Sequence, residues 1–175
     1  MVLRKFIQTT MREYLNENLN KSEIDSIVKY HIENDTPTKT YLDSNNIDIY
    51  NYFKNKLIEL NTLRDKNKIM IYRILDDSTF INKLKNSNEI KLGIYWSYNK
   101  QSVIDNFNYG DTNILLTGEI NTGSIEFSLT NELNTFGDWV YEDEIRLING
   151  KEILIKGIHR NGKKIKFDEN IRFFS

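Results

Sequence analysis

Two glutamates separated by a single residue are the strongest chemical signal in this sequence of 175 residues. Glu142 and Glu144 flank Asp143 at the start of a short apolar segment, which ends at the turn Asn149-Gly150. Alternate side chains of a β-strand point to the same face, so a strand here would present both glutamates together and direct Asp143 to the other face. Such a pair is costly unless cationic or hydroxyl groups lie against it. Carboxylates that do have such neighbours serve as bases and charge-stabilising groups in catalysis.

Much earlier in the chain, one arginine and one serine could provide the cation and the hydroxyl that this glutamate pair needs. Arg73 lies in Ile69–Leu75, a continuous apolar run that is typical of a buried strand. Ser97 follows the strand-like segment Leu92–Trp96. The three chemical pieces therefore stand on three separate predicted strands, in the order arginine, serine and glutamate pair.

These pieces resemble the catalytic strands of mono-ADP-ribosyltransferases of the arginine–serine–glutamate type. In that family the arginine lies near the end of the opening strand, the serine ends the next strand, and E-x-E lies on a later strand. Ile71–Arg73, Gly93–Ser97 and Glu142–Glu144 match this order, and the resemblance covers residues 68–167. One departure is that Trp96-Ser97-Tyr98 lacks the Ser-Thr-Ser run of many members. The resemblance implies an α+β fold, in which N-terminal helices precede a split β-sandwich ADP-ribosyltransferase-like domain.

The resemblance also implies a role for each piece, with NAD as co-substrate and no metal. Arg73 would bind the NAD phosphates. Glu144 would stabilise the oxocarbenium-like cation that forms as nicotinamide leaves, and Ser97 would orient Glu144. Glu142 would position or deprotonate the acceptor, and a glutamate at this position favours a protein arginine as that acceptor. The other implied contacts are aromatic: Tyr72, Tyr95, Trp96 and Tyr98 for NAD, and Phe136 and Trp139 for the target protein.

Other interpretations of the same residues stay open. Taken singly, an arginine or serine at a strand end is usually structural, and an E-x-E pair is usually the solvated face of an edge strand. The chain could keep the fold as a catalytically silent protein-binding module, although Glu144 argues against that. It could also be an NAD glycohydrolase without a protein acceptor. A retaining glycosidase fits less well, because its two carboxylates normally come from different strands.

Composition narrows the class of protein. Twenty-four basic and 25 acidic residues give a net charge of −1, which provides no electrostatic case for binding nucleic acid or a membrane. The chain has no cysteine and two histidines, which excludes thiolate sites and disfavours a histidine-rich metal site. The N-terminus lacks the apolar core of a secretory signal. We expect a cytoplasmic protein, either in the cell that produces it or in a bacterial host, such as a phage effector or a toxin. Secretion without a signal peptide stays open. The oligomeric state also stays open.

The pattern of apolar residues predicts two regions, a helical region over residues 1–66 and a catalytic domain over residues 67–175. Helices are expected around Phe6–Leu15, Ser22–Ile32 and Tyr50–Arg64. The second region should contain one short helix, one helical turn and several strands. The predicted segments are the helix 78–84, the turn 129–133 and the strands 69–75, 92–96, 114–120, 124–127, 144–147, 153–158 and 164–167.

Overall fold

The computed structural model describes residues 22, 49–106, 113–127, 130, 134 and 143–175. The chain divides into two compact units, of which the first comprises Met1–Lys66 with Phe127–Tyr141 and the second Asn67–Glu126 with Glu142–Ser175. Several predicted features lie outside the described residues. They are the first two helices, most of the turn 129–133, and the candidate residues Phe136, Trp139 and Glu142.

The first unit contains helix α4, Ile49–Arg64, which confirms the predicted third helix. Leu57, Leu60 and Leu63 recur at three-residue spacing and are buried. This spacing places them along one side of the helix, as expected for an amphipathic helix that packs through one face. At its end, the guanidinium carbon of Arg64 lies 4.8 Å from the ring centre of Phe127 in the same unit.

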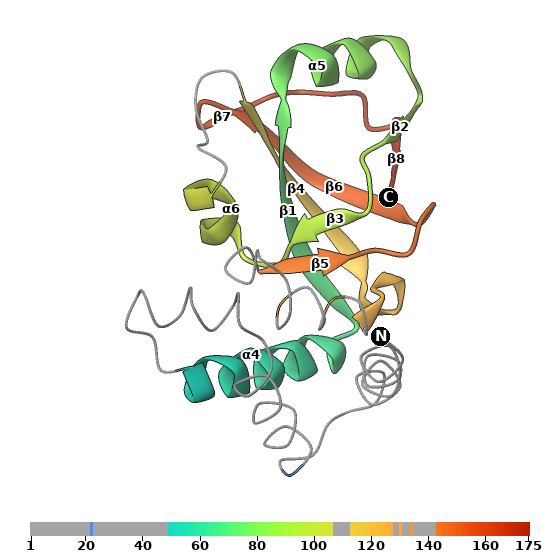
Figure 1. Ribbon diagram of the computed structural model, residues 1–175. Coiled ribbons are helices and arrows are strands. Elements are labelled where there is room, and N and C mark those ends of the chain that lie inside the picture. Colours follow the sequence, from blue (N-terminus) through green and yellow to red (C-terminus); the bar gives the residue numbers. More distant parts are fainter. Residues whose placement is uncertain (1–21, 23–48, 107–112, 128–129, 131–133, 135–142) are drawn as a thin grey trace, which may run out of the picture. The chain divides into compact units, whose positions relative to one another are not determined.

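The second unit is built on a mixed sheet of eight described strands in the order β2-β8-β6-β4-β1-β3-β5, with β7 paired to β6 (Figure 1). The strands β2 and β8 are parallel, and the other pairs are antiparallel. Their bounds are β1 Lys68–Asp76, β2 Glu89–Lys91, β3 Tyr95–Ser97, β4 Asn113–Asn121, β5 Glu144–Arg146, β6 Glu152–Arg160, β7 Lys163–Lys164 and β8 Arg172–Phe174.

Two helices complete this unit, α5 Asp77–Asn86 and α6 Lys100–Asn106. The predicted helix 78–84 is confirmed as α5. Its cap is Asp76, whose side chain accepts from the backbone N–H groups of Ser78 and Thr79 at 3.0 and 3.3 Å. Such a cap satisfies N–H groups that have no partner within the helix. Helix α6 was not expected from the sequence.

The core of the sheet comes from its central strands. Ile71 of β1, Ile114 and Leu116 of β4 and Ile158 of β6 are fully buried. Gly118 allows β4 to approach its neighbours closely, because a Cβ atom there would meet a methyl carbon of Ile153 at 2.8 Å. The helices together with this mixed sheet confirm the predicted α+β fold.

Some strand bounds differ from those predicted. The strand predicted at 92–96 is β3 at Tyr95–Ser97, with a separate strand β2 before it. Instead of a strand at 124–127, the chain forms a 3-10 turn, Thr122–Ser124, and a single bridge between Ile125 and Leu147. Strand β8 was not expected. These segments are short, and their pairing depends on partners distant in sequence rather than on local propensity. Among the described residues, no helix has the length and apolar character needed to cross a bilayer.

Candidate active site

The register of three neighbouring strands brings the serine and the glutamate together. Strand β1 pairs with β3 at Tyr72 and Ser97, and β3 pairs with β5 at Ser97 and Glu144. Directly opposed residues of antiparallel strands point to the same face. Tyr72, Ser97 and Glu144 therefore form a row across β1, β3 and β5. Figure 1 shows β3 and β5 next to each other.

Arg73 follows Tyr72 on β1. Because successive side chains of a strand point to opposite faces, the Arg73 side chain leaves the backbone on the face opposite to that of Tyr72. Its Nη1 atom donates to the carbonyl oxygen of Tyr95 at 2.5 Å, and the same guanidinium lies against Gly93. Burial lowers the pKa of Arg73, and the negative charge of Glu144 acts in the other direction. A guanidinium stays charged at neutral pH and has N–H donors beyond the one given to Tyr95. A partly desolvated cation with spare donors is suited to binding an anion.

Ser97 is buried and its hydroxyl bonds with backbone groups. The oxygen accepts from the N–H of Asn99 at 3.0 Å, and it lies 3.0 and 3.1 Å from the carbonyl oxygens of Asn99 and Asp143. A hydroxyl has a single proton, so it donates to one of these carbonyls at a time. The bond from Ser97 to the carboxylate of Glu144 stays a prediction.

A group of polar residues surrounds Asp143, of which the sequence had indicated only Tyr98, and for a different role. The side chain of Asp143 is buried, and it accepts from Tyr98, Asn99 and Ser102. Asn99 also accepts from the backbone N–H of Gln101 at 3.0 Å, at the start of α6. Asparagine is a favoured residue just before a helix, so Asn99 was a local signal that could have indicated the start of α6.

The aromatic residues predicted to contact NAD have very different environments. Tyr95 is 44% exposed, whereas Trp96 is 2% exposed and donates from its indole nitrogen to the carbonyl of Gly93 at 3.0 Å. A ligand could reach only a small part of the Trp96 ring. Tyr72 and Tyr98 are partly exposed. The roles of all four residues as NAD contacts stay predictions.

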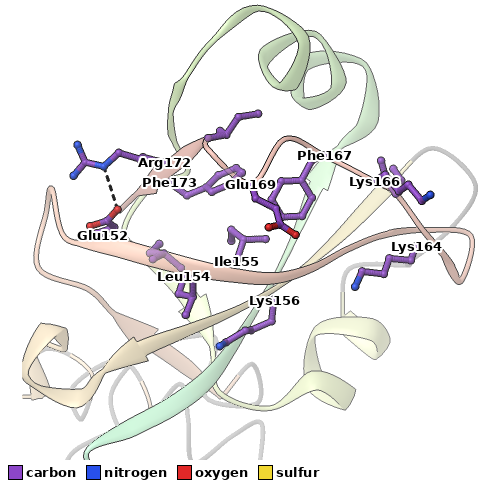
Figure 2. A pocket seen from close by; sticks show the side chains of 13 residues that line it. Glu152, Leu154, Ile155, Lys156, Lys164, Lys166, Phe167, Glu169, Arg172 and Phe173 are labelled. Atoms are coloured by element: carbon purple, nitrogen blue, oxygen red, sulfur yellow. Dashed lines mark hydrogen bonds and ion pairs between the residues drawn. The ribbon is translucent and has the colours of Figure 1, made fainter.

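A separate open hollow of about 680 Å³ lies beside β6 (Figure 2). Phe167 and Phe173 form part of its wall, with their ring centres 5.8 Å apart and their planes nearly perpendicular. Arg172 lies at one end, where its Nε donates to Glu152 at 3.1 Å. None of the predicted site residues lines this hollow. In the part of the chain that the structure describes, no cluster of three or more histidine or acidic side chains could hold a metal ion.

No protein-family model matches the chain, and no curated protein or solved structure shows significant similarity to it.

Proposed function

We propose that this protein is an NAD-dependent mono-ADP-ribosyltransferase, which transfers ADP-ribose to a protein side chain, with arginine as the expected acceptor. The observation that supports this most directly is the pairing of Ser97 with Glu144 across β3 and β5, together with the effect of the Glu144 charge on Arg73 of the neighbouring strand β1, although the Arg73 side chain starts on the opposite face. The proposal includes the finer fold, a split β-sandwich of the ADP-ribosyltransferase type. Three chemically matched residues on neighbouring strands support the resemblance better than any one of them alone.

In the proposed reaction the bond between nicotinamide and the ribose C1′ breaks, and nicotinamide leaves with the electron pair. Arg73 holds the diphosphate through its remaining N–H donors, beside the start of β3, where Gly93 leaves room for the guanidinium. Glu144 stabilises the cationic ribose, because an anion aimed at developing positive charge lowers the barrier. A guanidinium nitrogen of the target then attacks C1′, and Glu142 takes its proton.

The proposal is tested by incubating the protein with NAD labelled on its adenosine part and a bacterial lysate. Wild type should label protein and release nicotinamide. Glu144→Gln keeps the size of the side chain but removes its charge, so we expect both products to fall by about 10²–10³-fold. Glu89→Gln is the matched control, because Glu89 is an exposed carboxylate on β2, at the other end of the strand order.

The outcomes distinguish the alternatives. Nicotinamide release without labelled protein would indicate an NAD glycohydrolase. If wild type neither labels protein nor releases nicotinamide, the enzyme proposal fails and a silent binding module takes its place. Equal losses in Glu144→Gln and Glu89→Gln would also refute the assigned role of Glu144.

A further inference from the structure

We propose that Asp143 is a positioning residue, which fixes Glu144 against the serine segment of the site. The inference rests on the proposed function and adds a residue to which the resemblance gives no role. The residues concerned form the Asp143 cluster, meaning Asp143 together with Tyr98, Asn99 and Ser102.

Both oxygens of the Asp143 carboxylate accept hydrogen bonds within this cluster. The hydroxyl of Tyr98 donates to Oδ1 at 3.3 Å, and Nδ2 of Asn99 donates to Oδ2 at 2.7 Å. The hydroxyl of Ser102, in α6, also donates to Oδ2. Three donors on the two oxygens of one carboxyl group hold the side chain in a single orientation.

The backbone of Asp143 is tied to the same segment. Its carbonyl oxygen accepts from the N–H of Tyr98 at 3.1 Å and lies 3.1 Å from the hydroxyl oxygen of Ser97. Asp143 also has a positive φ of 51°. Aspartate tolerates this region better than most residues, because its short polar side chain can bond locally. A residue that is 7% exposed, with side chain and backbone both bound to one segment, has little freedom to shift.

This geometry fixes the backbone position from which the Glu144 side chain extends. Glu144 follows Asp143 directly and pairs with Ser97, so the cluster sets the carboxylate relative to β3. A misplacement of about 1 Å in a catalytic group can cost about 10²-fold in rate. Figure 1 shows β3 ending and β5 beginning at the edge where α6 lies.

Two substitutions of Asp143 separate its shape from its charge. Asp143→Asn keeps an oxygen for Asn99 and Ser102, and its amide can donate to the Tyr98 hydroxyl, which accepts as well as donates. We expect its kcat for nicotinamide release to stay within about threefold of wild type. Asp143→Ala removes all three side-chain bonds, and we expect kcat to fall about 10²-fold. The KM for NAD should stay within about twofold, because Arg73 is unchanged.

A double variant distinguishes positioning from a general structural role. If Asp143 acts through Glu144, then Asp143→Ala should cause no further loss of kcat in a Glu144→Gln background. A general structural role would lower the rate by the same factor in both backgrounds and would raise the KM. That result, or an unchanged kcat in Asp143→Ala, would overturn the proposal.

Hydrogen exchange at the Tyr98 amide distinguishes failure of this inference from failure of the proposed function. Asp143→Ala should speed that exchange, because the amide bonds to the carbonyl of Asp143. Faster exchange in a protein whose wild type releases no nicotinamide would overturn the enzyme and the positioning role together, while leaving the cluster as a structural contact. Unchanged exchange with unchanged kcat, in an active enzyme, would overturn the positioning role alone.

Discussion

Gly93 lies directly against the guanidinium of Arg73, since a Cβ atom at Gly93 would come within 3.1 Å of Nη1 and 3.3 Å of Nη2. Gly93 also has a φ of +87°, in the region that favours glycine. The glycine thus serves two needs, the backbone turn that leads into β3 and the space that Arg73 occupies.

Replacing Gly93 with alanine should therefore have two effects. The positive φ should cost about 1–2 kcal/mol of folding stability. The displaced guanidinium should raise the KM for NAD about tenfold, as expected for losing one charge-assisted hydrogen bond. Urea unfolding and nicotinamide-release kinetics measure the two effects separately.

Gly150→Ala provides the matched control. Gly150 has a comparable φ of +77°, but a Cβ atom there meets nothing within 4 Å. It should reproduce the loss of stability and leave the KM unchanged. An equal KM in both variants would mean that the position of Arg73 does not govern NAD binding.

The stability of the fold should depend on pH through His159. Burial lowers the pKa of His159 below its ordinary value of 6.5, and the positive charges of Lys100 and Lys164 add to the effect. The unfolded chain therefore binds a proton more readily at this residue, so stability falls as the pH drops through about 6.5 towards the folded-state pKa.

His159→Asn should reduce this part of the pH dependence, as measured by urea unfolding between about pH 7.5 and 5.5. Lys164→Gln should reduce it less, because it removes only one of the three causes. His31→Gln controls for the other histidine and should preserve the contribution of His159. A pH profile that is unchanged in His159→Asn would contradict the prediction.

Ile145 links the core to the site, because it is fully buried and stands between Glu144 and Arg146 on β5. Ile145→Ala should cost about 2–5 kcal/mol of unfolding free energy, from the lost apolar burial and the cavity left behind. Leu154→Ala is the control, since Leu154 is 53% exposed and should change stability by about 0.5 kcal/mol or less. Similar costs at the two positions would show that β5 does not pack as described.

The sequence alone could predict the long central strands, for a clear physical reason. The runs around Ile71, Leu116 and Ile155 are rich in isoleucine and leucine, and each is bounded by polar residues, which is a local pattern that favours strands. Strand β8 has three residues and helix α6 has seven, so neither is long enough to show a clear hydrophobic period. Their formation depends on tertiary partners that a local pattern does not contain.

The sequence predicted only part of the candidate site. Strand alternation around E-x-E could not describe Asp143, because Asp143 precedes β5 and has a positive φ of 51°, and it could not identify what Asp143 would meet. Its bonds with Tyr98 and Ser102 span 45 and 41 residues of the sequence. Nor could the sequence reveal that Gly93 makes room for Arg73, because that contact requires the exact approach of β1 and β3.

Strand β5 ends the described strand order, and it pairs with β3 over only three residues, whereas β1 and β4 pair over nine. Sub-global opening in proteins begins where few backbone bonds must break. We therefore expect the strand that carries Glu144 to open at a lower denaturant concentration than the centre of the sheet. Mild denaturant should then abolish the proposed activity at a concentration that leaves the central strands folded.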